Sequence, residues 1–349
     1  MERSSEVILR NASRLRPGPV LLVNPPRDSL FSKLTDSGRN VRSFTQDFGD
    51  YHWLQSCGAE AVFGVVPEPA VEAQAEAETV ILHLPREKDR LTLMLHSIST
   101  WLPADSVLWL VGENKAGVKS ATRHMQLFFG EVSKLDSARH CGLYAASAPR
   151  KDEPFELSAY ELAWEFEFSG AAVHIVSLPG VFAHGRLDKG SRLLLQALAE
   201  LRPSGSILDF ACGSGVIGCA VLAAGMQADL TMLDVSATAI ESSRLSLARN
   251  GLSARLVAAD GLTELDGRYD WIVSNPPFHR GISSDLETAA QFFRRAGTFL
   301  TESGRILIVC NRHLPYASWL QKYFQEVRTL DKNNEFTIIQ AVKPRHIEG

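Results

Sequence analysis

The sequence predicts an α/β protein that consists of two consecutive domains with mostly parallel sheets. Apolar segments rich in β-branched residues alternate with amphipathic segments of helical length, which is the pattern of parallel α/β units. The chain has 349 residues, enough for two domains that each bury a hydrophobic core. Residues 101–114 also match residues 299–311 in register, which indicates an internal duplication. We therefore expect a first domain at residues 1–150 and a second at residues 151–349.

The second half of the chain shows the alternation most clearly. Strands are expected where short apolar segments end at polar or glycine residues, and helices where apolar residues recur every three or four positions. The expected strands are residues 206–211, 228–235, 254–261, 269–275, 304–311 and 336–342. The expected helices are residues 215–225, 237–251, 286–300 and 317–325.

The first half repeats the latter part of this order. Strands are expected within residues 78–88, 106–117 and 142–148, and helices at residues 90–102 and 120–130. In the register of the duplication, residues 83–88 take the place of residues 274–281, and residues 20–28 take the place of residues 207–215. The first half therefore begins, like the second, with a strand that ends in a turn.

Composition and charge limit the possible partners. The net charge is −4, with 36 basic and 40 acidic residues, and neither half is strongly basic. An RNA partner would thus be recognised by local patches and by shape. No segment approaches the roughly 18 uninterrupted apolar residues of a membrane-spanning helix, and the first residues lack the apolar core of a secretory signal. We expect a cytoplasmic protein without membrane association.

The cysteines are predicted to be reduced and mostly buried. They are an odd number, are widely spaced and include no C-x-x-C pair, so they suggest neither a disulfide framework nor a zinc site. They are Cys57, Cys141, Cys212, Cys219 and Cys310. We accordingly expect no bound metal.

A glycine-rich loop follows the first strand of the second half. Gly213, Gly215 and Gly218 fit G-x-G-x-x-G between a strand and a helix, the fingerprint of dinucleotide-binding folds. Asp209, however, ends the strand directly ahead of this loop, where a carboxylate would repel a pyrophosphate. The same carboxylate favours a cationic ligand such as S-adenosylmethionine, which carries an ammonium and a sulfonium group. An NAD-dependent oxidoreductase is therefore disfavoured.

Carboxylates stand at the ends of three consecutive expected strands. Besides Asp209, Asp234 is placed to accept hydrogen bonds from both ribose hydroxyls, and Asp260 to meet the adenine amine. Gly213 and Gly215 would let the backbone approach the methionyl part of the ligand. The simpler interpretation, that these aspartates only cap helices, remains open. The trio favours S-adenosylmethionine as the cofactor.

Residues 272–278, IVSNPPF, suggest how an amine could be activated. An amine attached to a base or an amide is a poor nucleophile, because its lone pair is delocalised. The side-chain oxygen of Asn275 and the backbone carbonyl of Pro276 can accept its two N–H groups and leave the lone pair free to attack. Pro277 stiffens the turn, and Phe278 offers a face for stacking a flat substrate. We therefore predict that Asn275, Pro276 and Phe278 are catalytic.

A second Asn-Pro-Pro stretch, at residues 24–26, is interpreted differently. It follows the first strand of its half, and Arg27 stands where an aromatic residue would be needed. Two prolines that end a strand explain it without any chemistry. Cys212, inside the glycine loop, is interpreted as a packing residue because direct methyl transfer needs no thiol.

Several segments together carry a family resemblance. Residues 208–218, 233–251 and 269–281 resemble class I S-adenosylmethionine-dependent methyltransferases of the [ND]PP[FY] group. Residues 111–121, 134–144 and 177–198 extend the likeness to the ribosomal RNA small subunit methyltransferase C family, the guanine-N2 methyltransferases of bacterial 16S rRNA. The resemblance implies two tandem Rossmann-like methyltransferase domains with seven-stranded, mostly parallel sheets. It also implies that the N-terminal copy is degenerate and the C-terminal copy catalytic.

The resemblance extends the set of expected site residues. It implies that Asp188, Gly190 and Ser191 line the cofactor or target pocket. The expected cofactor-binding residues are Asp209, Ala211, Gly213, Gly215, Asp234, Val235, Asp260, Gly261 and Asn275. The expected substrate-binding residues are Asp188, Gly190, Ser191, Pro277, Phe278, His279 and Arg280.

The resulting hypothesis is methyl transfer from S-adenosylmethionine to N2 of one guanine in 16S rRNA, by a monomer that unstacks its target base. The partner would be the rRNA or the small ribosomal subunit. A protein-glutamine or adenine-N6 methyltransferase of the same motif group is an alternative, although the partner domain of the former should be helical. A noncatalytic RNA-binding assembly factor is another. Basic residues of the first half form either an RNA contact or a solvated surface. These are Lys115, Lys119, Arg123, Lys134 and Arg139.

Overall fold

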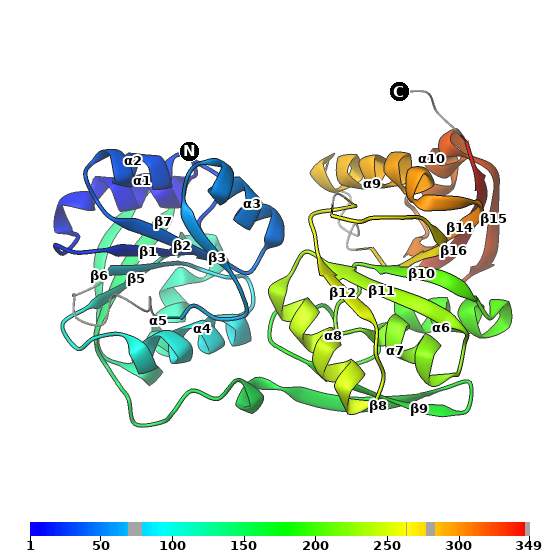
Figure 1. The fold of residues 1–349 in the computed structure, drawn as a ribbon. Coiled ribbons are helices and arrows are strands. Elements are labelled where there is room, and N and C mark those ends of the chain that lie inside the picture. Colours follow the sequence, from blue (N-terminus) through cyan, green and yellow to red (C-terminus); the bar gives the residue numbers. More distant parts are fainter. Residues whose placement is uncertain (69–78, 263, 277–282, 346–349) are drawn as a thin grey trace. The chain divides into compact units, whose positions relative to one another are not determined.

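The chain forms two compact units, each with its own sheet and core. The structure, a computed structural model, describes residues 1–68, 79–262, 264–276 and 283–345. The N-terminal unit is Met1–Tyr160 and the C-terminal unit is Glu161–Gly349 (Figure 1). The sequence predicts the domain boundary after residue 150, and the structure divides the chain into its two compact units after Tyr160. No helix of the described residues is long and apolar enough to cross a membrane.

The N-terminal unit is a seven-stranded sheet between two layers of helices. Its strands are β1 (Val20–Val23), β2 (Val41–Thr45), β3 (Glu60–Phe63), β4 (Thr79–His83), β5 (Val107–Glu113), β6 (Phe129–Ala138) and β7 (Cys141–Pro149). Its helices are α1 (Arg3–Arg10), α2 (Leu30–Asp36), α3 (Phe48–Ser56), α4 (Lys88–Trp101) and α5 (Val118–Phe128), with short 3-10 turns at Ala12–Arg14 and Asn114–Ala116. The strand order is β3-β2-β1-β4-β5-β7-β6, in which β7 runs antiparallel to both of its neighbours, β5 and β6.

The C-terminal unit repeats this architecture. Its main sheet contains β10 (Gly205–Phe210), β11 (Ala228–Asp234), β12 (Arg255–Ala258), β13 (Tyr269–Ser274), β14 (Leu300–Asn311), β15 (Phe324–Lys332) and β16 (Phe336–Pro344). Its helices are α6 (Lys189–Leu201), α7 (Val216–Ala223), α8 (Ala237–Arg249), α9 (Ser283–Ala296) and α10 (Tyr316–Tyr323). Leu157–Tyr160 and Gly297–Phe299 form 3-10 turns. The strand order β12-β11-β10-β13-β14-β16-β15 matches that of the first unit strand for strand, which confirms the two seven-stranded, mostly parallel sheets.

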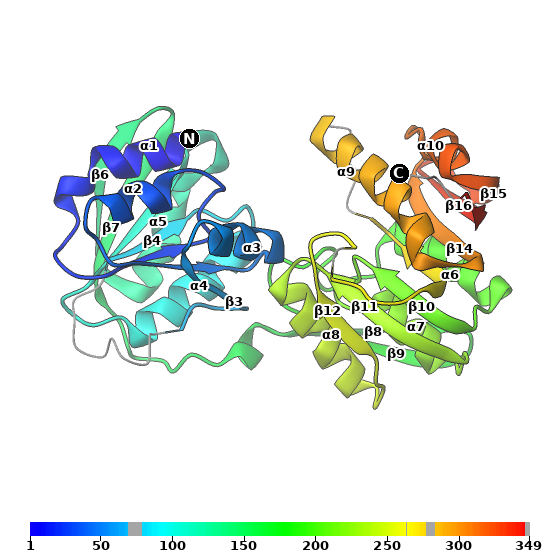
Figure 2. The ribbon, with the colours of Figure 1, turned by 45° about the horizontal axis from the view of Figure 1, so that its top comes forward.

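Each sheet is buried on both faces. In the C-terminal unit, α6, α7 and α8 cover one face and α9 and α10 the other (Figure 1 and Figure 2). In the N-terminal unit, α1–α3 and α4–α5 divide the faces in the same way. The nearly continuous apolar sequence of the central strands follows from this burial.

A two-stranded hairpin precedes α6 and has no counterpart in the sequence-based prediction. It consists of β8 (Leu162–Phe168) and β9 (Ala171–Ser177), and β9 packs on α7 and α8. Ser246 of α8 holds the hairpin, because its hydroxyl accepts a hydrogen bond from Val176 N at 2.9 Å and donates one to Val176 O at 3.1 Å. The hairpin leads directly into the loop before α6.

The sequence analysis also missed β6 and β15, each of which pairs antiparallel with its neighbour in its own sheet. Both lie at sheet edges. Their sequences are largely exposed and polar, so no alternation of buried and exposed residues marks them. The sequence-based helices at residues 120–130 and 317–325 end where these strands begin.

Candidate active site

The carboxyl ends of β10, β11, β12 and β13 meet at a cavity of about 540 Å³ in the C-terminal unit. The loop before α6, the glycine loop and α9 complete its walls. Many of the residues expected from the sequence line this cavity. They are Asp188, Ser191, Asp209, Ala211, Gly213, Asp234, Val235, Asp260, Gly261 and Asn275. The topology thus brings together residues up to 87 positions apart, the separation of Asp188 and Asn275.

Asp209 is a buried carboxyl group on the cavity wall. It is only 2% exposed, and its Oδ2 accepts a hydrogen bond from Gly218 N at 3.0 Å. Burial raises the pKa of Asp209 to about 7, the neighbouring Asp234 adds to the increase, and the Gly218 hydrogen bond partly offsets it. A buried acid with one backbone donor is stabilised in its ionised form by a nearby cation, so this wall suits a positively charged ligand.

Asp234 ties the end of β11 to the glycine loop. Its Oδ2 accepts from Gly213 N at 2.9 Å, and its Oδ1 accepts from Ser236 N at 3.0 Å. Burial raises the pKa of Asp234, although hydrogen bonds from the backbone of Ser236, Gly213 and Val235 lower it. The side chain is partly exposed to the cavity, where its remaining acceptor capacity is available to hydroxyl groups.

The three glycines of the loop have different roles. Gly213 has a φ of 58° and lines the cavity, and an added Cβ would come no closer than 3.9 Å to Val181. Gly215, with a φ of 81°, is not among the residues that line the cavity. An added Cβ at Gly215 would lie 2.8 Å from the side chain of Met232, and one at Gly218 would lie 2.9 Å from Leu230. Gly215 and Gly218 therefore allow α7 to pack closely on β11.

Asn275 is held by the N-terminus of α6. Its Nδ2 donates to Asp188 Oδ2 at 3.0 Å and to Ser191 Oγ at 2.9 Å. Asp188 is the N-cap of α6 and also accepts from Gly190 N at 2.8 Å and Ser191 N at 3.1 Å. Because a carboxylate can only accept, these contacts orient the amide and leave Oδ1 as the remaining acceptor.

The Oδ1 atom of Asn275 is buried and has no hydrogen-bond partner among the described residues. A buried acceptor without a donor costs about 1–3 kcal/mol, so this oxygen is suited to receive a hydrogen bond from a ligand. Gly190 makes the arrangement possible, since an added Cβ would lie 3.0 Å from the Asp188 carboxylate and 3.5 Å from Asn275 Nδ2. Gly190 thus supports the site by packing and is not part of the cavity wall.

The remaining residues of the IVSNPPF stretch are only partly described. Pro276 is buried and follows Asn275 directly. Pro277, Phe278, His279 and Arg280 lie outside the described residues. Within the described part of the chain, no group of three or more His, Cys, Asp or Glu side chains is placed to hold a metal ion.

The N-terminal unit has lost the corresponding site. Gly18 and Asn24, before and after β1, have positive φ, as do Gly205 at the start of β10 and Ala211 after it, and this aligns the two copies. The strand registers then give the residues at the positions of Asp209, Asp234 and Asn275. They are Leu22, Thr45 and His83. All three are buried, and the first offers no polar atom at all. The N-terminal copy is therefore degenerate.

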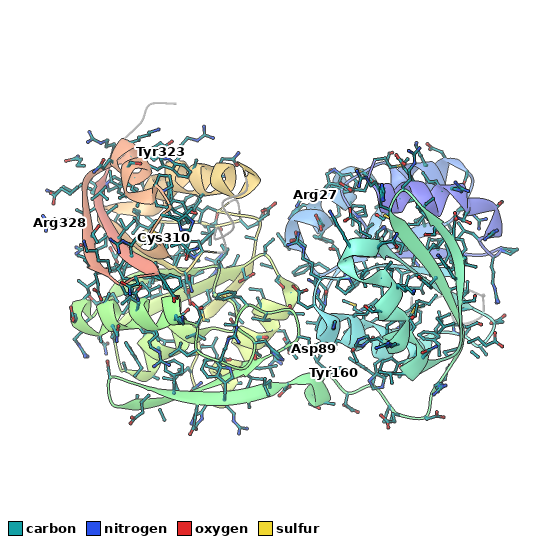
Figure 3. The ribbon with its side chains drawn as sticks, turned by 180° about the vertical axis from the view of Figure 1, so that it is seen from behind. Arg27, Asp89, Tyr160, Cys310, Tyr323 and Arg328 are labelled. Atoms are coloured by element: carbon teal, nitrogen blue, oxygen red, sulfur yellow. The ribbon has the colours of Figure 1, made fainter. Side chains whose placement is uncertain are left out.

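The early Asn-Pro-Pro stretch is structural. Asn24 has a φ of 50°, and its Oδ1 accepts from Gln46 N at 2.9 Å, which joins the ends of β1 and β2. Arg27, labelled in Figure 3, pairs with Asp50 at 2.6 Å instead of offering an aromatic face. Asn24 corresponds to Ala211 of the second copy, and the residue that corresponds to Asn275 is His83.

Cys212 is buried against α8. Its Sγ lies 3.4 Å from Ser243 Oγ, and burial together with the charges of Asp234 and Asp209 raises the pKa of the thiol well above its ordinary value. The thiol therefore stays protonated and unreactive at neutral pH. The other four cysteines are also free, and of these only Cys57 is exposed.

We expect Cys212→Ser to keep substantial methyl-transfer activity, because a protonated, buried thiol takes no covalent part. Single-turnover assays with the folded variant would measure this. Complete loss of turnover with intact cofactor binding would instead indicate a covalent route.

Some cavity residues were not singled out from the sequence. Phe182 and Arg186 come from the loop before α6, and Gln291, Phe292 and Arg295 come from α9. Phe292 stacks on Phe210 of β10 with ring centroids 4.2 Å apart. Which face of α9 meets the cavity follows from the packing of α9 on the sheet, and the helical period of the sequence alone does not distinguish cavity from core.

Both units match families of known proteins. Residues 172–340 match the family described as Methyltransferase small domain, and residues 5–163 match the family described as Methyltransferase small domain N-terminal. The structure also resembles the T. thermophilus 16S rRNA N2 G1207 methyltransferase, solved in complex with AdoMet and guanosine. The TM-score is 0.83 and the identity 23%, over 98% of this chain and 92% of that one. This likeness shows the shared fold.

Curated relatives match over almost the full chain. A protein of Pseudomonas entomophila is 39% identical over 345 residues, 98% of this chain and 100% of its own length, and is named Ribosomal RNA small subunit methyltransferase C. A protein of Pseudoalteromonas atlantica with the same name is 36% identical over 342 residues, 97% of this chain and 98% of its own. With identities of this size over both units, the chain belongs to the ribosomal RNA small subunit methyltransferase C family.

Proposed function

We propose that this protein transfers a methyl group from S-adenosyl-L-methionine to the exocyclic N2 of a guanine in 16S rRNA of the small ribosomal subunit. The observation that carries the proposal is the Asn275 amide. Asp188 and Ser191 hold its nitrogen, and its oxygen has no donor among the described residues, beside a cavity lined by three strand-end carboxylates. The names of the relatives, and the guanosine in the T. thermophilus structure, agree with rRNA methylation.

The cavity suits S-adenosylmethionine. Asp209 is a buried carboxyl group that a cation would stabilise, Asp234 has acceptor capacity for two ribose hydroxyls, and Asp260 lines the same cavity. Gly213 leaves room at the loop for a ligand to approach the backbone. When bound, the cofactor supplies an electrophilic methyl group on its sulfonium. Ala211, Val235 and Gly261, which also line the cavity, complete the proposed binding residues.

Asn275 has the central task in the chemistry. Its Oδ1 accepts one N–H of the guanine amine, and the Pro276 carbonyl accepts the other, which leaves the nitrogen lone pair free to attack. Fixed acceptors stabilise the positive charge that develops on nitrogen without reorganising water. Asp188 and Ser191 keep the amide from rotating. The base is proposed to be held by Pro277 and Phe278, and its phosphates by His279 and Arg280.

We expect Asp234→Ala to weaken cofactor binding by about 1–3 kcal/mol, the usual cost of losing hydrogen bonds to a charged group. The variant also loses the contact with Gly213 N, so its folding is checked by thermal unfolding. Calorimetric titration with S-adenosylmethionine measures the effect. An unchanged affinity in a folded variant would remove Asp234 from the site.

The proposed function is tested by identifying the product. The protein is incubated with labelled S-adenosylmethionine and 16S rRNA, free or in small subunits, from a strain that lacks the modification. Digestion to nucleosides should yield N2-methylguanosine. Labelled N6-methyladenosine would identify an adenine as the substrate, and a labelled protein would identify a glutamine side chain. The absence of any labelled product would favour a noncatalytic assembly factor.

The N-terminal unit is proposed to position RNA within a monomeric, cytoplasmic enzyme. Lys119 and Lys134 are exposed and suit such a contact. Lys115 pairs with Glu113 at 3.0 Å, and Arg139 pairs with Glu6 at 3.0 Å, so a phosphate would have to compete with a carboxylate at these two positions. The α/β fold of this unit disfavours the protein-glutamine alternative, which predicts a helical partner domain.

A further inference from the structure

The loop before α6 presents an aromatic ring at the cavity. Phe182 lines the cavity and is 57% exposed, an exposure that only Leu127, at 59%, exceeds among the exposed large hydrophobic side chains of the described residues. Its neighbour Val181 is only 6% exposed, and its side chain would lie 3.9 Å from a Cβ added to Gly213. An aromatic ring that is exposed beside a binding cavity offers a face on which a flat group can stack.

The loop that carries Phe182 is held in place by the hairpin of β8 and β9. Ser177, which is completely buried, accepts a hydrogen bond from Gly185 N at 3.2 Å, and its hydroxyl lies 2.9 Å from His184 Nδ1. Gly185 has a φ of 77°, and an added Cβ would lie 2.2 Å from the side chain of Leu162 on the hairpin. The hairpin therefore supports the loop, and Phe182 projects from a defined support.

Two arginines accompany the ring. Arg186 ends the same loop, Arg295 lies on the last turn of α9, and both are exposed and line the same cavity. Neither guanidinium has a carboxylate partner among the described residues, whereas Arg244 and Arg328 of the same unit are paired with glutamates. Since no described carboxylate pairs with them, these two guanidinium groups are suited to an anionic ligand.

We propose that Phe182, Arg186 and Arg295 form a docking subsite for the RNA strand at the mouth of the active-site cavity. Phe182 stacks on an unpaired base, and the two guanidinium groups contact the adjoining phosphates. A stacking face combined with cations is the usual chemistry for binding single-stranded nucleic acid. This inference rests on the proposed function, because it supplies the contacts that hold an unstacked strand where Asn275 can reach its guanine.

The overall charge of the chain supports an RNA contact confined to this place. A net charge of −4 gives no general attraction to phosphates, so binding must come from a few local contacts. A peptide could also contact the ring, but it lacks the phosphates that suit two arginines without a carboxylate partner among the described residues. The subsite therefore fits a nucleotide strand better than a peptide.

The test measures RNA affinity without turnover, in the presence of S-adenosylhomocysteine. The RNA is 16S rRNA or small subunits from a strain that lacks the modification. Phe182→Ala should weaken RNA binding about tenfold or more, and Phe182→Trp should restore most of it. Arg186→Gln and Arg295→Gln should each lower the slope of log affinity against log salt by about 0.7–0.9. Calorimetric affinity for S-adenosylmethionine should stay unchanged in all four variants.

Matched controls lie on the same unit away from the cavity. Leu330→Ala removes a hydrophobic side chain that is 40% exposed on β15, and Arg249→Gln removes an exposed arginine at the end of α8. Both should bind RNA like the unchanged protein. If Phe182→Ala behaves like Leu330→Ala, or the arginine variants behave like Arg249→Gln, the subsite does not exist.

The outcome separates this inference from the proposed function. If the unchanged protein makes a product other than N2-methylguanosine while the Phe182 and arginine variants still lose RNA affinity, the subsite stands and the guanine assignment falls. If N2-methylguanosine forms but the variants bind RNA normally, the subsite falls alone. Loss of methylation of a protein substrate, with RNA binding unaffected, would overturn the subsite in favour of a peptide site.

Discussion

Asn275→Ala should lower the rate of single-turnover methyl transfer by about 10²–10³-fold and leave the affinity for S-adenosylmethionine nearly unchanged. The variant removes Oδ1, the acceptor proposed to hold the target amine in the transition state. The α6 N-cap survives, because Asp188 keeps its hydrogen bonds from Gly190 N and Ser191 N. The loss should therefore appear in the chemical step and not in folding.

Asn24→Ala is the matched control. Both asparagines precede two prolines, but Asn24 Oδ1 is occupied by Gln46 N and its unit carries Leu22 and Thr45 in place of the cavity carboxylates. The substitution should cost about 1 kcal/mol of stability, the scale of one hydrogen bond, and should spare catalysis. Thermal unfolding and single-turnover rates are measured for both variants. A folded but inactive Asn24→Ala protein would make the N-terminal unit catalytic and contradict the assignment of Asn275.

The contrast between the two stretches shows what the sequence can predict. The residues Asp209, Asp234 and Asp260 could be expected at one edge of the sheet, because parallel strands bring their carboxyl ends to the same edge, and all three line one cavity. That rule needs only consecutive parallel strands, which the alternation of strands and helices predicted. The register of the duplication then assigned the early Asn-Pro-Pro to the first strand of its unit.

Long-range contacts were beyond the same reasoning. The bonds from Asn275 to Asp188 and Ser191 span 87 and 84 residues and join a strand end to a helix cap. Only the family resemblance placed these residues near the site, and the amide orientation they impose depends on side-chain geometry. Gly215 was expected at the cofactor, but a single motif letter does not distinguish close approach to a ligand from close packing on Met232.

Edge strands and exposed side chains were missed for a related reason. β6 and β15 bury few side chains, so their sequences carry no periodic signal. Phe182 resembles any loop aromatic until the fold places it at the cavity mouth. Sequence patterns report burial, and residues whose role is to stay exposed are found only in the structure.

Asp209→Asn should weaken S-adenosylmethionine binding by about 10-fold to 100-fold and at the same time stabilise the ligand-free protein at neutral and alkaline pH. The amide is close to isosteric and its oxygen can still accept from Gly218 N, but it provides no negative charge for a cationic ligand. The two effects share one cause, since the buried charge that attracts the ligand is unfavourable without it.

The pH dependence of stability follows from the raised pKa. The folded protein holds the Asp209 proton up to about pH 7, whereas the unfolded chain releases it near its ordinary pKa of about 4. The folded state therefore binds more protons between these values, so the contribution of this group to stability falls as pH rises from about 4 to 7 and is constant above. At pH 8, Asp209→Asn should be more stable than the unchanged protein by about 1–4 kcal/mol, the upper end being the full pKa shift.

Cofactor affinity should show the opposite trend. A cation binds the ionised carboxylate, so affinity in the unchanged protein should rise about tenfold from pH 6 to pH 8 and then level off, while Asp209→Asn should show no such rise. Calorimetric titration at pH 6, 7 and 8 and thermal unfolding without ligand measure both trends. A variant that binds S-adenosylmethionine as tightly as the unchanged protein at pH 8, or gains no stability there, would show that the Asp209 charge is not what the cofactor meets.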